Sequence, residues 1–206
     1  TGGSERGVLY GVYAFLEKFV GWRFLAAESC YRGQETGAYL APVEKLFPPE
    51  TTEINEGYDY TTAPVIKFRD LFGHATVHED WCAKNRINGD IWKLKTTPAY
   101  MGGAETFATD GGHSFDRLIP EDEYMPTHPE YFALADGKRT GGPMSQLCLT
   151  ADGLAEEVAR RVIEIADAHP EAKYISVSQN DNENFCRCDK CRAEEARIGR
   201  GNLLFG

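Results

Sequence analysis

The run Tyr174-Ile175-Ser176-Val177-Ser178-Gln179-Asn180-Asp181-Asn182-Glu183-Asn184 decides the fold class of this chain. At its start, Ile175 and Val177 alternate with Ser176 and Ser178, which is the pattern of a strand with two different faces. The residues that follow are all amides or carboxylates, and this abrupt change is typical of a parallel strand whose carboxyl end opens into a site. A solvated surface loop has the same composition, so the upstream sequence must decide between the two.

The sequence upstream of this run predicts a βαβ unit. Residues 145–150 have the pattern of a strand, and Leu154, Val158 and Val162 then recur every four positions until His169-Pro170 ends the helix. Strand, helix and strand in this order normally form a right-handed unit in a parallel sheet. Because ligands of such folds bind beyond the carboxyl ends of the strands, we expect the polar run to face a site.

The N-terminal region predicts a helix followed by a strand. Apolar residues recur at helical spacing from Val8 to Phe19, and Gly21 stands where a helix C-cap glycine belongs. Residues 22–25 are typical of a short strand. We interpret this segment as a packed helix-to-strand unit without a direct role in chemistry.

A domain boundary is expected near Thr62. Residues 30–62 lose all periodicity and are interrupted by glycines and prolines, as connectors are. This divides the chain into a first domain at residues 1–62 and a second at residues 63–206. In the second domain we expect strands that start near Val65, Asp90, Ser145 and Tyr174.

Three side chains outside the polar run are candidates to bind a ligand. Arg69 lies inside the strand expected from Val65, where a charged side chain either pairs internally with Asp70 or faces a site. His113 follows two glycines in a long loop, and long loops that follow strands are often functional. Trp92 is an aromatic that either stacks on a ring of the ligand or packs in the core.

Three of the six cysteines lie close together, at Cys186, Cys188 and Cys191. Their spacing is one ligand short of a tetrahedral thiolate site for structural zinc, and Cys148 or a histidine is a candidate for the fourth ligand. A disulfide within the cluster and packed free thiols are the alternatives. In each case the cluster would hold the loop that carries Asp181 and Glu183 without performing chemistry.

The composition narrows the classes of partner. With 42% hydrophobic and 12% aromatic residues, the 206-residue chain has the material for a core. A net charge of −10 argues against nucleic acid, against a zinc-ribbon module that binds it, and against an anionic membrane surface. No apolar run approaches the roughly 20 residues that a membrane span needs. The sequence therefore favours a globular domain whose main partner is neither nucleic acid nor a membrane.

Several longer motifs resemble known carbohydrate-acting families. Residues 4–17 and 21–25 resemble the small α/β domain that precedes the barrel in α-glucuronidases and β-hexosaminidases. A second set of motifs resembles a bacterial domain-of-unknown-function family of predicted glycoside hydrolases related to the α-glucuronidases. These motifs are Asn85-Arg86-Ile87-Asn88-Gly89, Gly111-Gly112-His113-Ser114-Phe115, His128-Pro129-Glu130-Tyr131-Phe132-Ala133-Leu134, Gln146-Leu147-Cys148-Leu149-Thr150 and Ser176-Val177-Ser178-Gln179-Asn180-Asp181-Asn182.

The resemblance implies an α/β fold: the first half of a TIM-type (β/α)8 barrel, preceded by the end of a small hexosaminidase-like α/β domain. In the α-glucuronidases the general acid is a glutamate just past the fourth barrel strand, and both Asp181 and Glu183 lie near the corresponding place. In the hexosaminidases an arginine of the first strand grips sugar hydroxyls, and Arg69 is placed similarly. Four strands make half a barrel, so we expect the second catalytic carboxyl group on a strand beyond residue 206.

These observations support two hypotheses. In the first, the protein is a glycoside hydrolase, with a uronic-acid-containing polysaccharide as a candidate substrate and Asp181 or Glu183 protonating the leaving oxygen. Arg69, His113, Asn180 and Trp92 would then bind the sugar. In the second, the same pocket binds or scaffolds carbohydrate without catalysis. Neither hypothesis needs a catalytic cofactor.

Overall fold

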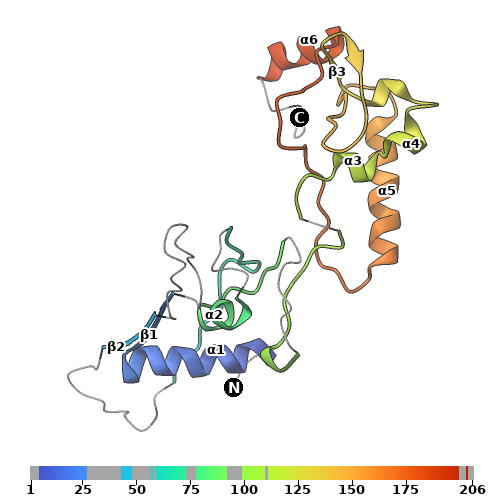
Figure 1. The fold of residues 1–206 in the computed structure, drawn as a ribbon. Coiled ribbons are helices and arrows are strands. Elements are labelled where there is room, and N and C mark those ends of the chain that lie inside the picture. The colour runs from blue at the N-terminus through green and yellow to red at the C-terminus, as the bar shows by residue number, and fades with distance from the viewer. Residues whose placement is uncertain are drawn as a thin grey trace, which may run out of the picture. The chain divides into compact units, whose positions relative to one another are not determined.

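The structure is a computed structural model that describes residues 5–26, 43–47, 57, 59–72, 78–91, 99–109, 111–199 and 203. The chain divides into two compact units, Thr1–Glu105 and Thr106–Gly206, which are described separately below (Figure 1). The boundary expected near Thr62 stays a prediction. In the described part of the chain, no helix has the length and apolar character to cross a membrane.

The first unit contains the helix and strand expected near the N-terminus. Helix α1 (Glu5–Phe15) continues as one π-helical stretch, η1 (Leu16–Val20), and ends at Gly21, whose φ of 79° is readily adopted only without a side chain. Strand β1 (Trp22–Ala26) follows at once and pairs antiparallel with β2 (Val43–Leu46). The expected helix, glycine cap and strand are confirmed.

A buried arginine anchors α1 in this unit. The Arg6 guanidinium donates to the carbonyl of Met101 at 2.9 Å, at the end of η3 (Ala99–Met101), and to the carbonyl of Ile87 at 2.6 Å. Ile87 lies just beyond the short helix α2 (Glu79–Lys84). A charged side chain this deeply buried is stable only because backbone carbonyls replace its water.

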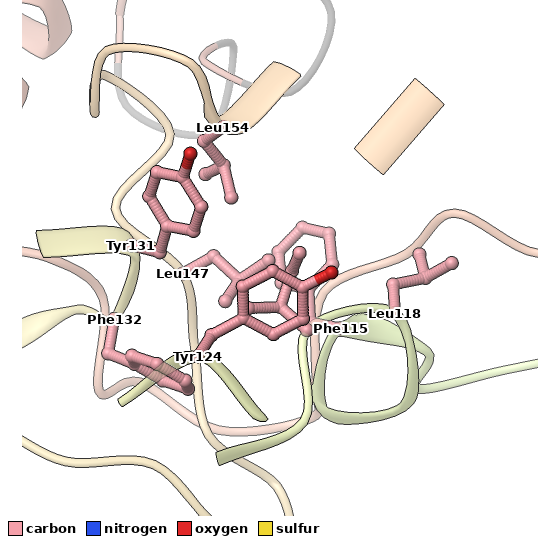
Figure 2. Close-up of a cluster of buried hydrophobic side chains, with 8 residues drawn as sticks. Phe115, Leu118, Tyr124, Tyr131, Phe132, Leu147 and Leu154 are labelled. Carbon is pink, nitrogen blue, oxygen red and sulfur yellow. The ribbon is translucent and has the colours of Figure 1, made fainter. Parts of the chain in front are cut away.

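The second unit is built around one apolar cluster. Its elements are α3 (Phe115–Leu118), α4 (Glu121–Tyr124), η4 (Pro129–Tyr131), β3 (Leu134–Ala135), β4 (Lys138–Arg139), α5 (Leu154–Ala168) and α6 (Asp189–Ile198). Figure 2 shows the buried side chains, with Tyr124 and Tyr131 beside Leu147 and Leu154. Val158, Val162 and Ile165 of α5 pack against this cluster, so the helix and its buried face agree with the sequence.

A tight hairpin joins β3 to β4. Leu134 pairs with Arg139 and Ala135 with Lys138, and the two residues between the strands are Asp136 and Gly137. Their φ angles of 50° and 75° are both positive, as a type I′ turn requires. The hairpin therefore forms at the turn that the Asp-Gly pair predicts.

Isolated bridges lie outside the named strands in the described part of the chain. Phe107 makes a parallel bridge with Tyr174, and Leu147 an antiparallel bridge with Phe132. Beyond Tyr174 the Ser178 amide donates to the Ser114 hydroxyl at 2.8 Å, so a side chain occupies a position that a neighbouring strand's carbonyl would take. Within the described residues, the named strands form two antiparallel pairs, and the (β/α)8 barrel stays a prediction.

Candidate metal centre

The second unit brings four cysteine sulfurs together. The Sγ atoms of Cys148, Cys186, Cys188 and Cys191 all lie within 4.8 Å of one another. Three of these residues are buried, and Cys188 is partly buried. The expected cluster is thus present, and Cys148 is its fourth member.

Three separate elements deliver these sulfurs. Cys148 directly follows Leu147, and its amide donates to the Tyr131 carbonyl at 2.8 Å. Cys188 is the N-cap of α6, and its sulfur accepts the Cys191 amide at 3.5 Å. Cys186 is fixed against β3, because the Leu134 amide donates to its sulfur at 3.3 Å.

The sulfur spacing fits a tetrahedral metal site. Four sulfurs at about 2.3 Å from one ion lie about 3.8 Å apart. The Cys148 sulfur lies 3.7 Å from the sulfurs of both Cys188 and Cys191. A disulfide has a sulfur–sulfur distance of about 2.05 Å, and all four thiols are free. The four cysteines can therefore hold a metal ion without large movements.

The protonation of the cluster is shared among its members. A hydrogen bond from Cys191 is the largest influence on Cys148 and, against the effect of burial, lowers the pKa of Cys148 to about 4. The same hydrogen bond raises the pKa of Cys191, and burial raises that of Cys186. One sulfur is thus held as a thiolate by its neighbours. A metal ion would replace the shared protons, since only thiolates bind metals well.

Two further side chains surround the sulfurs. The Thr150 hydroxyl lies 3.1 Å from the Cys191 sulfur and 3.8 Å from that of Cys148. Arg139 of β4 lies on the backbone beside the cysteines, because its guanidinium donates to the Phe132 carbonyl and Phe132 is bridged to Leu147. Burial alone would lower the pKa of Arg139, but its interaction with Cys148 and the charge of nearby sulfurs raise it. Hydrogen-bond donors and positive charges around a metal site stabilise thiolate ligands.

The polar run at residues 179–184 is held by a buried amide network. Asn180 is fully buried, and its Nδ2 donates to the Ser145 carbonyl at 2.5 Å. The Gln146 side chain accepts from the Asn180 amide at 3.2 Å and donates to the Asn180 carbonyl at 2.6 Å. Gln146 also donates to the carbonyl of Asn182 at 3.2 Å. The run is therefore fixed from both ends, by this network and by the cysteines that follow it.

The loop that carries His113 lies beside the start of this run. The Ser114 amide donates to the Ser178 carbonyl at 3.1 Å, and the His113 Nδ1 atom lies 3.4 Å from the Gln179 carbonyl. His113 has a φ of 47°, an unusual conformation for a residue with a side chain.

The candidate acids lie on the surface of this unit. Asp181 and Glu183 are both exposed, on either side of the partly buried Asn182. Asn182 donates through Nδ2 to the Met144 carbonyl at 2.8 Å and accepts the Asn184 amide at 2.9 Å. The loop thus presents both carboxylates outward from a fixed backbone.

The remaining candidates belong to the first unit. The Arg69 guanidinium donates to the carbonyls of Arg86 at 2.7 Å, Ile66 at 2.7 Å and Lys67 at 3.0 Å. These contacts order its own loop. Trp92 lies outside the described residues. The sugar-binding roles of Arg69, His113, Asn180 and Trp92 stay predictions, as do the catalytic roles of Asp181 and Glu183.

Sequence reasoning did not assign roles to three residues of the site: Gln146, Thr150 and Arg139. Gln146 and Thr150 lie two residues on either side of Cys148, in a segment whose pattern predicts a strand. A glutamine next to the apolar residues of that strand was the available signal for a buried network. Arg139 follows the hairpin turn, and nothing in the sequence connects it to the cysteines.

The family was identified by comparison with known proteins. A family described as "Domain of unknown function (DUF4838)" matches residues 39–204. The chain belongs to this family. The match covers the polar run and all four cysteines of the candidate metal centre. Neither the curated proteins nor the solved structures contain a match to the chain.

Proposed function

We propose that this DUF4838 chain is part of a carbohydrate-acting hydrolase in which a four-cysteine zinc centre fixes the polar loop at residues 179–184. The observation that carries the metal assignment is the set of four sulfurs within 4.8 Å of one another. The loop leads directly into three of these cysteines, so the centre and the loop are one structural unit.

Zinc is the ion that best suits these ligands. Four thiolates in a tetrahedral arrangement are typical of structural zinc, which leaves no position open for water or substrate. Such a centre contributes folding energy and does not take part in the reaction. In this proposal the loop is held in place by the bound ion, where other proteins would use a larger hydrophobic core.

The loop provides the acid side of the proposed reaction. Asp181 or Glu183 would protonate the glycosidic oxygen as the bond breaks, and His113 and Asn180 would help to bind or position the sugar. Both carboxylates are exposed in this unit. A general acid works in a pocket that excludes water, so substrate or another part of the protein would have to cover these carboxylates during the reaction.

The carbohydrate assignment is supported by the motif resemblance described above, together with the His113 loop beside Gln179. The proposed mechanism needs a second carboxyl group. It would lie about 5–5.5 Å from the first for retention of configuration, or about 6.5–9.5 Å for inversion. A (β/α)8 barrel would supply it from another strand, and this architecture is part of the proposal.

Activity assays on the full-length encoded protein test the hydrolase. The protein is incubated with a panel of aryl glycosides and uronic-acid-containing polysaccharides, and released sugar is measured. Asp181→Asn or Glu183→Gln should reduce turnover by about 10²–10⁴-fold, the usual contribution of a general acid. Asp167→Asn, which alters an exposed carboxylate of α5, is the matched control and should leave turnover unchanged.

The same assay separates catalysis from binding alone. In an affinity gel, a polysaccharide that binds the protein slows its migration. If a polysaccharide slows the wild-type protein and no sugar is released from it, the non-catalytic carbohydrate-binding alternative is correct. Wild-type turnover that survives both substitutions would show that neither carboxylate is the acid.

A further inference from the structure

A four-thiolate centre carries an excess of negative charge. Four thiolates outnumber the two positive charges of a divalent ion, and this excess must be balanced inside a partly buried site. Hydrogen-bond donors around the ligands do so, and their loss weakens metal binding. The surroundings of the four sulfurs therefore determine how tightly an ion is held.

Arg139 is placed where it can supply this balance. Its Nη1 atom donates to the Phe132 carbonyl at 2.5 Å and to the Glu130 carbonyl at 3.0 Å. Phe132 is bridged to Leu147, the residue before Cys148. The guanidinium is thus fixed on a backbone segment that is bridged to the residue next to Cys148.

Other cationic side chains near the cysteines are more exposed. Arg187 lies between two ligands in sequence, but its side chain is exposed. Lys190 is exposed and pairs with Asp152 at 3.0 Å, and Arg192 is also exposed. Water and salt screen charges in such positions. Arg139 is partly buried, so its charge acts on the sulfurs with less screening.

We propose that Arg139 is the counter-ion of the metal–thiolate centre and that it sets the affinity of the centre for zinc. The hairpin of β3 and β4 provides two contributions to the centre. Leu134 donates its amide to Cys186, and its partner Arg139 holds its guanidinium on Phe132, which is bridged to the residue before Cys148. This inference rests on the zinc centre proposed above. Arginine suits the position because its planar group binds two carbonyls at once and keeps its charge.

Zinc competition with a chromophoric chelator tests the assignment, using the wild-type chain and the variants Arg139→Gln, Arg139→Lys and Arg187→Gln. Arg139→Gln should weaken zinc binding by about 10–100-fold, the usual effect of removing a group that supports metal ligands. Arg139→Lys keeps the charge and loses the planar fork, so its affinity should fall between those of wild type and Arg139→Gln. Arg187→Gln, the matched control, removes an exposed charge and should change affinity by less than about threefold.

A spectroscopic measurement distinguishes an electrostatic effect of Arg139 on the sulfurs from a purely structural role in the hairpin. In cobalt-loaded protein, a positive charge close to the sulfurs stabilises their lone pairs and raises the energy of the sulfur-to-cobalt charge-transfer band. That band should therefore move to longer wavelength in Arg139→Gln and stay in place in Arg187→Gln.

Each contrary outcome overturns a definite part of the inference. Equal affinities for wild type and Arg139→Gln refute the role of Arg139 while leaving the zinc centre intact. If Arg139→Lys and Arg139→Gln lose zinc affinity equally and the cobalt band does not move, Arg139 only holds the hairpin in place. If Arg139→Gln and Arg187→Gln lose zinc affinity equally, the effect comes from the net charge of the unit and not from the position of Arg139. A wild-type chain that binds no zinc refutes both proposals.

Discussion

Gln146 is the side chain on which the position of the polar loop depends most. It is 3% exposed, and its amide makes hydrogen bonds to the Asn180 amide, the Asn180 carbonyl, the Asn182 carbonyl and the Asn182 side chain. Replacement by alanine removes all four contacts and leaves a small cavity. We therefore expect Gln146→Ala to loosen the loop and to destabilise the second unit.

The magnitude follows from which partners are left without a hydrogen bond. After truncation the Asn180 carbonyl still accepts the Asn182 amide, and the Asn182 side chain still accepts the Asn184 amide. The buried Asn180 amide loses its acceptor, which costs about 1–3 kcal/mol. The cavity and the weaker contacts add about 1 kcal/mol. The expected loss in free energy of unfolding is about 2–4 kcal/mol.

Urea unfolding with zinc present measures this loss, with Gln179→Ala as the matched control. Gln179 is an exposed glutamine next to Asn180, so its truncation should change stability by less than about 0.5 kcal/mol. Amide hydrogen exchange adds a local readout, and the Asn180 amide should exchange faster in Gln146→Ala. A Gln146→Ala variant as stable as Gln179→Ala, with unchanged exchange at Asn180, would refute the network as the support of the loop.

Three further predictions concern the core, acid stability and the metal. Leu118→Ala, at a core position that is 1% exposed, should lower the free energy of unfolding by about 2–5 kcal/mol in urea. Hydrogen bonds from Arg160 and, second, Tyr124 lower the pKa of Glu157 to about 2 from an ordinary 4.5, so its contribution to stability is present above about pH 4.5 and lost as the pH falls toward 2. Arg160→Gln should therefore destabilise the protein at pH 7 and much less at pH 2, when both are compared by urea unfolding. Free zinc at 100 times its Kd should stabilise the wild type by about 2.7 kcal/mol and Cys191→Ser far less, and a thermal shift that is equal in both would contradict the metal assignment.

The helices were predictable because their signal is local. The repeat of Leu154, Val158 and Val162 gave both the existence of α5 and the side that it buries. The same reasoning was less successful for α1, where Val8 and Val12 are 54% and 51% exposed. Periodicity identifies an apolar face of a helix, but it does not show what covers that face.

The strands and the site depend on partners that are distant in sequence. The Ser178 amide binds the hydroxyl of Ser114, and alternation within residues 174–178 does not reveal this. The spacing of the three clustered cysteines identified them as candidate metal ligands. Cys148 was one candidate among several for the fourth ligand, because spacing alone cannot identify a partner 40 residues away from Cys188. Arg139 could not be assigned at all, since its role arises from a hairpin that faces the cysteines only in the folded unit.

X-ray absorption spectroscopy of the zinc-loaded protein tests the central claim most directly. If Cys148, Cys186, Cys188 and Cys191 hold one ion, elemental analysis should give one zinc per chain. The fine structure should then fit four sulfur ligands at about 2.3 Å, with no nitrogen or oxygen in the coordination shell. A shell that contains nitrogen or oxygen, or a purified protein without zinc whose thiols are oxidised to disulfides, would contradict the account.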